Sequence, residues 1–236
     1  MNYTEYVSTI ANLLVVPADN AEFLADVPNI SENANNRIYR ELDLLNTVVR
    51  DASATLTTST RTFNLPSTLG TFVVTEQINV ITPVAAASPD QGTRNALVPA
   101  SKDMLDFLYP SSTGSTVPQY FAMISQSTII VAPWPDQAYP VEVVGTIRPA
   151  PLSESVTTTL LSVYFPDMLI AASMVRGAAF LKNYGAAIDD PKMAITWEQT
   201  YQMLKEAAFT EESRKKFTEA GWSSKEPAPA ATPPRT

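Results

Sequence analysis

The chain of 236 residues contains no cysteine and no histidine. Without cysteine, disulfides, thiolate nucleophiles and zinc sites built on sulfur are excluded. Without histidine, the commonest general base and metal ligand is missing, together with every Ser-His-Asp arrangement. Most enzyme classes therefore lose their usual catalytic groups. We predict that the chain is not an enzyme and that it uses no cofactor and no metal.

Positive charge is also scarce, since 16 lysines and arginines stand against 24 aspartates and glutamates, a net charge of −8. A protein that grips nucleic acid usually carries a basic face that neutralises phosphates. The basic cluster Arg214, Lys215 and Lys216 falls late in an expected helix, where it can complement the helix dipole. Tight DNA binding is therefore not expected, although DNA can pass beside an acidic protein.

Long apolar runs are missing as well. The most apolar helical segment, residues 166–181, contains Asp167 and Arg176 and is shorter than the ~20 apolar residues that span a bilayer. Residues 1–15 lack a cationic start and include Glu5, so we do not expect a secretory signal peptide. The sequence predicts a soluble protein.

Helical periodicity is present at both ends of the chain. Residues 3–15 are predicted to form a first helix that Pro17 ends. A second helix is expected after Pro28, with Asn29 or Ser31 as its cap. Its apolar stripe consists of Ile30, Ala34, Ile38, Leu42, Leu45 and Val49. On its surface, Arg37 and Glu41 lie one turn apart and can pair.

The last third of the chain returns to helix. One helix is expected to open at Pro166, where a first-turn proline is tolerated, and small residues in it would let another helix approach closely. A final helix is expected to begin at Asp189 or Asp190. Its apolar stripe consists of Met193, Trp197, Tyr201, Leu204 and Ala208.

Strand patterns fill the middle of the chain, separated by turn residues. The predicted strands span residues 54–65, 72–81, 119–124, 128–131 and 139–148, of which the third and fourth form a hairpin. One face of the second strand would carry Phe72, Val74, Ile78 and Val80, and the inward face of the last would carry Tyr139, Val141, Val143 and Ile147. Residues 85–99 are predicted to form a projecting polar loop, and residues 101–109 a short helix capped by Ser101.

The order of helices, strands and helices, without alternation of strand and helix, predicts an α+β fold with an antiparallel sheet. We expect the N- and C-terminal helices, residues 1–51 and 152–217, to form one helical bundle. Residues 52–151 would then be an inserted β module. Residues 218–236 are rich in proline and alanine, so they are expected to form an extended C-terminal tail.

Two acidic pairs are the candidates for chemistry. Asp103 and Asp106 could form a carboxylate pair of the glycosidase kind, and Asp189 with Asp190 could bind a hard cation. Helix capping is the simpler interpretation of the second pair. The first pair is better interpreted as the solvated face of a short helix, opposite Met104, Phe107 and Leu108. No catalytic, cofactor-binding or metal-binding residue is therefore predicted.

Two tryptophans are the candidates for binding a partner. Trp134 lies between two prolines, where it either covers the edge of its own sheet or anchors a neighbouring subunit. Trp222 lies in the expected tail, where a partner surface best explains it. Because residues 211–217 have little apolar face, the segment from Phe209 onward is predicted to be a partner-engaging arm. The candidate interface residues are Trp134, Arg214, Lys215, Lys216 and Trp222.

Two stretches carry a pattern that is known from a protein family. The second helix ends in Arg37-Ile38-Tyr39-Arg40-Glu41-Leu42-Asp43. Later come Pro118-Gln119-Tyr120-Phe121-Ala122, a hairpin, Pro149-Ala150-Pro151-Leu152-Ser153, and Tyr164-Phe165-Pro166-Asp167. This pattern resembles the head-to-tail adaptor proteins of tailed bacteriophages, in which a Pro-x-Tyr-Phe-Ala strand, a hairpin, a Pro-x-x-Leu-Ser turn and a Tyr-x-Pro-Asp helix recur in that order.

The resemblance implies a structural virion protein without catalysis. It implies a homo-oligomeric ring, usually dodecameric, that is clamped beneath the portal protein, extends the DNA channel and joins the tail nozzle or tail tube protein. Double-stranded DNA would pass through the lumen without specific binding, and the ring would act in genome retention and ejection. The implied location is the head–tail interface of the virion, after synthesis in the host cytoplasm and with no membrane involved.

Two functions from other classes stay open at this point. The threonine-rich β module would also suit a receptor- or glycan-binding tail component, which would present a concave platform and form a trimer more readily than a ring. A hydrolase built on carboxylates alone is the other alternative. The absence of histidine and cysteine argues against it.

Overall fold

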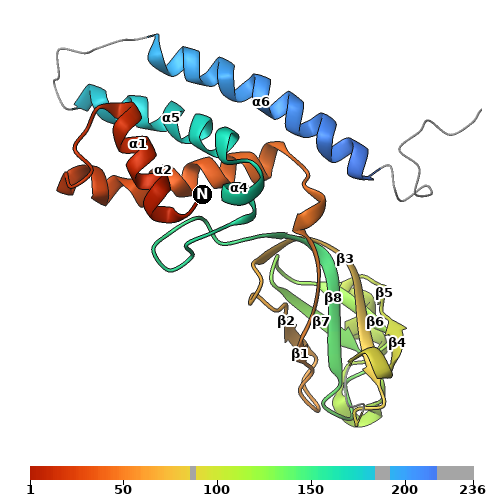
Figure 1. The fold of residues 1–236 in the computed structure, drawn as a ribbon. Helices are drawn as coiled ribbons and strands as arrows, with labels where there is room; N and C mark the ends of the chain where they lie inside the picture. Colours follow the sequence, from red (N-terminus) through yellow and green to blue (C-terminus); the bar gives the residue numbers. More distant parts are fainter. Residues whose placement is uncertain (86–88, 184–191, 217–236) are drawn as a thin grey trace, which may run out of the picture. The chain divides into compact units, whose positions relative to one another are not determined.

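A computed structural model describes residues 1–85, 89–183 and 192–216 of the chain. The chain divides into two compact units, which we call the helical unit (Met1–Leu45 and the chain from Pro151) and the β unit (Asn46–Ala150) (Figure 1). Helices make up the first unit, and two sheets with one α-helix make up the second. The predicted α+β fold class is confirmed.

The helical unit contains α1 (Tyr3–Leu14), α2 (Ala21–Glu41), α4 (Leu160–Tyr164), α5 (Pro166–Asn183) and α6 (Met193–Lys216). The first helix agrees with its prediction and begins in a capping box, in which the side chains of Asn2 and Glu5 each accept a backbone N–H of the other residue. The opening of α5 at Pro166 is also as predicted. The expected start of the last helix, at Asp189 or Asp190, lies outside the described residues.

The prediction for α2 is wrong at both ends. The helix begins after Asn20, whose side chain accepts the backbone N–H groups of Glu22 and Phe23, and it continues through Pro28. The helix ends at Glu41, before the last two residues of its predicted stripe. Leu45 lies in a short 3-10 helix, η1 (Leu45–Thr47), and Val49 lies in β1 (Val48–Thr55). The proline is tolerated because it lies on the exposed side of the helix.

Helix α5 is central to the core of the helical unit, where it packs against α1, α2 and α6 (Figure 1). Gly177 permits a close approach to α1, because a Cβ atom on it would lie 3.2 Å from Leu14 Cδ1. The hydroxyls of Tyr6 and Ser173 are hydrogen-bonded at 2.8 Å in the same buried layer. The predicted stripe of α6 is confirmed, since Tyr201 and Ala208 are buried and Met193, Trp197 and Leu204 pack partly against the core.

Two four-stranded sheets form the β unit. Sheet A has the order β1, β8 (Pro140–Arg148), β3 (Thr71–Thr82), β4 (Thr93–Ala96), and its pairs are antiparallel. Sheet B has the order β2 (Thr62–Asn64), β7 (Thr128–Ala132), β6 (Tyr120–Met123), β5 (Val98–Pro99). Its β5–β6 pair is parallel and the other pairs are antiparallel. The β6–β7 hairpin agrees with the prediction.

The β unit is layered as sheet A, sheet B and helix α3 (Lys102–Leu108). Residues of both sheets share one core, in which Phe63, Ile129 and Val131 of sheet B meet residues of sheet A. The predicted inward residues of β8, which are Tyr139, Val141, Val143 and Ile147, all belong to this core. Helix α3 covers the other face of sheet B and is capped by Ser101, as predicted. Two further 3-10 turns complete the unit, η2 (Pro89–Gln91) and η3 (Ser112–Gly114).

Three expectations for the β unit are wrong. The strand expected at residues 54–65 is divided, because β1 ends at Thr55 and β2 begins only at Thr62. Val74, expected on the same face as Phe72, is 53% exposed, because the β3–β8 register shifts between Phe72 and Val74 and again between Thr75 and Gln77. The expected polar loop at residues 85–99 contains strand β4, which pairs with β3, and part of sheet B in β5.

Candidate assembly interface

Helix α3 turns an apolar stripe to solvent, contrary to the orientation predicted for it. Phe107 is 83% exposed, and Met104 and Leu108 are exposed beside it. The one buried residue of the helix is Leu105, which packs in a small cluster with Ala122, Ile130 and Ala132 of sheet B. Because residues three and four apart lie on one side of a helix, Met104, Phe107 and Leu108 form a continuous surface, which we call the α3 stripe.

Asp106, on another side of α3, forms ion pairs with Arg61 and with Lys102. Arg61 Nη1 lies 2.8 Å from Asp106 Oδ1, and Lys102 Nζ lies 2.7 Å from Asp106 Oδ2. The hydrogen bond from Lys102, assisted by that from Arg61, lowers the pKa of the Asp106 carboxyl. The acid of a glycosidase pair needs a raised pKa, so the arrangement of Asp103 and Asp106 does not suit that chemistry.

Trp134 packs within the β unit. Its indole Nε1 donates to the backbone carbonyl of Tyr109 at 3.1 Å, and the guanidinium carbon of Arg61 lies 5.6 Å from the ring centroid. That distance is within the range of a cation–π contact. These contacts favour the interpretation that Trp134 covers its own unit. A role of Trp134 in binding another subunit stays a prediction.

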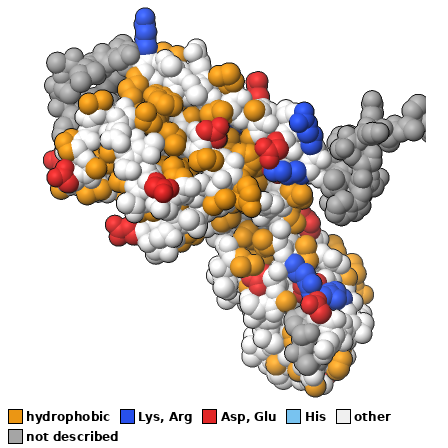
Figure 2. Space-filling view, viewed as in Figure 1, with side chains coloured by type: hydrophobic (Ala, Val, Ile, Leu, Met, Phe, Trp, Pro, Cys, Tyr) orange, Lys and Arg blue, Asp and Glu red, His pale blue; other side chains and the backbone are white. Residues whose placement is uncertain are grey.

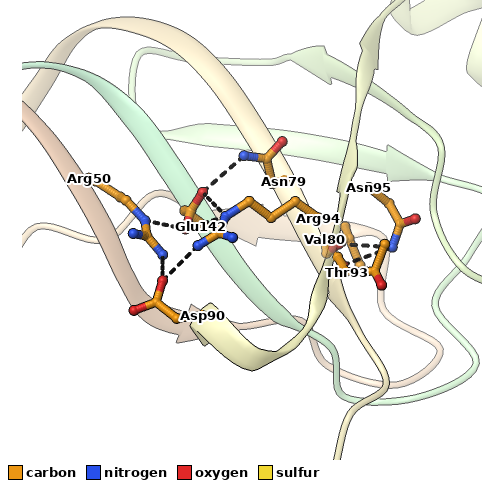
Figure 3. A network of polar contacts seen from close by, with 8 residues as sticks. All are labelled: Arg50, Asn79, Val80, Asp90, Thr93, Arg94, Asn95 and Glu142. Carbon is orange, nitrogen blue, oxygen red and sulfur yellow. Dashed lines mark hydrogen bonds and ion pairs between the residues drawn. The ribbon is translucent and has the colours of Figure 1, made fainter. Parts of the chain in front are cut away.

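A buried carboxylate joins all four strands of sheet A (Figure 3). Glu142 of β8 is only 2% exposed and accepts hydrogen bonds from Arg50 of β1, Asn79 of β3 and Arg94 of β4. Asp90 of η2 pairs with both arginines from the outside. Burial alone would raise the pKa of Glu142, but the hydrogen bonds from Arg94, Asn79 and Arg50 outweigh it and lower the pKa.

The helical unit has its own ionic cluster between α2 and α6. Two nitrogens of Arg37 donate to the two carboxylate oxygens of Glu198 at 2.7 and 2.6 Å, and the predicted pair with Glu41 is present at 2.9 Å. The guanidinium also lies 4.1 Å from the ring centroid of Tyr201. The hydrogen bond from Arg37 is the main cause that lowers the pKa of Glu198 to about 2.

The C-terminal end of α6 is attached to the helical unit, against the expectation that it gains little from packing. Lys215 Nζ lies 2.7 Å from Glu211 Oε1 and 5.5 Å from the ring centroid of Phe165. Lys216 pairs with Asp43. Two of the three predicted interface cations therefore bind within their own unit, whereas Arg214 is exposed.

Glu212 completes this attachment. It is 4% exposed, its Oε2 accepts the backbone N–H of Leu45 at 2.9 Å, and its Oε1 accepts from Lys215 at 2.6 Å. A buried carboxylate thus connects the last helix with the segment that follows α2. Sequence reasoning placed Glu212 on a charged helix end, because no local pattern signals a partner 167 residues away.

The predicted interface residues are divided between the two units. Trp134 lies in the β unit, and Arg214, Lys215 and Lys216 lie in the helical unit. Trp222 lies outside the described residues, as do Asp189 and Asp190. The α3 stripe and the Glu142 cluster were both missed. A signal for the α3 stripe was available, since Met104, Phe107 and Leu108 are too many apolar residues for a two-turn helix to bury.

Neither a metal centre nor a membrane helix is found in the described part of the chain. Within it, no three acidic side chains come together as ligands for a metal ion. The described helices are also too short or too polar to cross a bilayer.

The sequence matches the model of a known protein family. The family model described as SU10 adaptor protein matches residues 1–225. A comparison with curated proteins gave no match.

Proposed function

The chain belongs to the SU10 adaptor protein family and is a structural phage adaptor, and from this premise we propose that it forms a ring at the head–tail interface of the virion. In this proposal the ring is dodecameric, sits beneath the portal protein, extends the DNA channel and receives the tail nozzle or tail tube protein. The observation that carries the proposal is the family match, which includes both units and not only one of them.

The chemistry of the chain supports a passive role in this channel. A chain with a net charge of −8 lacks the excess of cations that would hold DNA by its phosphates. Three of its arginines, Arg37, Arg50 and Arg94, pair with carboxylates of their own unit. An acidic wall lets DNA slide past without capturing it. The protein performs no catalysis in this proposal.

The proposed contact with the portal is the arm that follows α6. Because Lys215 lies over the ring of Phe165 and Lys216 pairs with Asp43, the end of α6 is held on the helical unit, and we place the start of the arm after Lys216 and not at Phe209. Residues 217–236 contain Trp222, a large apolar side chain that can anchor the arm on a partner surface. Exposed Arg214 lies beside the start of the arm and is available to the same partner.

The test uses purified full-length chain with and without its portal protein. We expect a monomer or weak oligomer in isolation, because copies of the same negative charge repel one another, and complete rings once the portal is present. Mass photometry and negative-stain electron microscopy of the same samples give the subunit number. Stable rings at micromolar concentration without portal, or failure to join the portal, would contradict the proposal.

A second measurement tests the passive channel wall. Binding of the chain to a random DNA duplex at physiological salt should be negligible in an anisotropy titration. Submicromolar binding at that salt would exclude an inert wall.

A further inference from the structure

The α3 stripe is an exposed apolar surface on a helix that cannot turn to bury it. Leu105 anchors the inner side of α3 in sheet B, Ser101 caps its start, and Arg61 holds Asp106 on the flank. Phe107, the most exposed of the large apolar residues, therefore stays in water in the isolated chain. A rigidly held aromatic side chain in an apolar surface is typical of a binding anchor.

The surroundings of the α3 stripe carry no net charge. Lys102 and Arg61 balance Asp103 and Asp106, so the local charge is zero on a chain whose total is −8. Identical acidic copies repel each other, and their contact is least opposed where the local charge vanishes. This makes a second copy of the chain a suitable occupant, and it argues against a basic partner such as a cationic peptide.

A complementary hollow lies in the helical unit. It has a volume of about 470 Å³ and is formed by α1, the start of α2 and the segment before α4, with Tyr3, Val7, Ala18, Leu24 and Glu154 in its lining. We call it the α1 groove. Leu24 is an exposed apolar residue there, and Glu154 is the charged member of the lining. Figure 2 shows apolar side chains exposed on the face of the helical unit that is turned to the viewer.

A second hollow of the helical unit has the wrong chemistry for the α3 stripe. It lies between α2 and α5, and its lining includes Arg37, Arg40, Glu41 and Arg176. Burying a phenylalanine there would remove water from charged groups without providing new hydrogen bonds or ion pairs to replace it. The α1 groove has one charged side chain in its lining, Glu154, so burying a phenylalanine there removes water from fewer charged groups.

We propose that the α3 stripe of one copy docks in the α1 groove of a neighbouring copy. The inference rests on the proposed ring and names the residues of its subunit contact. Because the two surfaces are different, the contact is head-to-tail, and such a contact can continue from copy to copy and close into a ring. A contact of α3 with α3 would instead end at a dimer.

The absence of native cysteine allows a direct test. Two proteins with one cysteine each are mixed, assembled with the portal and treated with a short bis-maleimide. One carries Asp103→Cys, at an exposed position one turn before Phe107 that leaves the α3 stripe intact, and the other carries Leu24→Cys. We expect a cross-linked dimer on a denaturing gel from the mixture and none from either protein alone. The control replaces Leu24→Cys by Met203→Cys, an apolar position on α6 that is even more exposed, and should give no dimer.

A second variant measures how much the Phe107 side chain contributes to the strength of the same contact. Phe107→Ser should leave the melting temperature unchanged, because the side chain is exposed, and should weaken ring formation at least tenfold. Val74→Ser, which also replaces an exposed apolar residue of the β unit, should assemble normally. Loss of folding in Phe107→Ser would contradict the assignment of this residue to a surface.

The outcomes separate this inference from the proposed function. Rings seen by electron microscopy without the mixed cross-link overturn the docking of the α3 stripe in the α1 groove and leave the adaptor ring standing. A dimer from Asp103→Cys alone shows a symmetric contact and also overturns it. If no ring forms with portal under any condition, the proposed function fails and the inference fails with it.

Discussion

Among the described residues each unit buries one glutamate, and the two differ in what they hold together. Glu142 in the β unit binds side chains from three neighbouring strands, two of them arginines. Glu212 in the helical unit binds one backbone N–H and a lysine on its own helix. The first carboxylate connects a whole sheet, whereas the second connects one helix end to one segment. The comparison indicates that the β unit resists local opening and that α6 can separate from its unit more easily.

The largest effect is expected from Glu142→Ala. Its loss leaves the buried amide of Asn79 without this acceptor and the two arginines without their shared partner, so we expect the free energy of unfolding to fall by about 3 kcal/mol. Urea unfolding followed by far-UV circular dichroism measures the change. Glu76→Ala, an exposed position on the same sheet, is the control and should stay within about 0.5 kcal/mol of the parent. Equal stabilities of the two variants would refute the structural role of Glu142.

A smaller and local effect is expected from Glu212→Ala. The variant removes the acceptor of the Leu45 N–H, which costs about 1–2 kcal/mol. Hydrogen exchange should speed up at the Leu45 amide and in the last two turns of α6, but not in sheet A. Glu211→Ala, at the exposed neighbouring position, serves as control. Faster exchange across the whole helical unit would mean that α6 does not open separately.

Acid should weaken the helical unit through Glu198. Its pKa in the folded chain is about 2, below the value of about 4.3 for an unfolded glutamate, so its stabilising contribution is complete above the unfolded pKa. That contribution is lost as pH falls through the folded pKa. Because the pair is partly exposed, we expect at most about 1 kcal/mol of it between pH 5 and 2. Glu198→Gln should flatten the pH dependence of the melting temperature in this window, and Glu206→Gln, an exposed position, should not.

The smallest effect on stability is expected from truncation after Lys216. The last described attachment of α6 is the pair of Lys216 with Asp43, which the truncation keeps, so we expect the melting temperature to be unchanged while binding to the portal weakens. Trp222→Ala should reproduce part of that loss. Unaltered affinity of the truncated chain for the portal would mean that residues 217–236 are not the arm.

Local signals were sufficient for much of the fold. A few adjacent residues determine each of three features, which are the capping box of α1, the Ser101 cap of α3 and the β6–β7 hairpin. The start of α2 was missed because Pro28 was treated as a helix breaker. A proline inside a helix removes one hydrogen bond and crowds the carbonyl four residues earlier, and α2 continues through it.

The candidate sites were less accessible from sequence, because they depend on strand order and on which residues reach the core. Glu142 is separated along the sequence from Arg50 by 92 residues and from Arg94 by 48, and no pattern in the sequence near Glu142 indicates these partners. Met104, Phe107 and Leu108 of α3 were expected to face the core because they are apolar. That reasoning failed, because Leu105 is the residue of α3 that packs against sheet B.

The attachment of α6 also has a mechanical consequence. A load applied to the C-terminal end of the chain would reach the last turn of α6 first. From there, Lys216 would pass it to Asp43 and Glu212 would pass it to Leu45, only three residues before strand β1 begins. The last described turn of α6 and the entry to the β unit are thus joined through two side chains, so a pull on α6 would act directly on the segment that leads into β1.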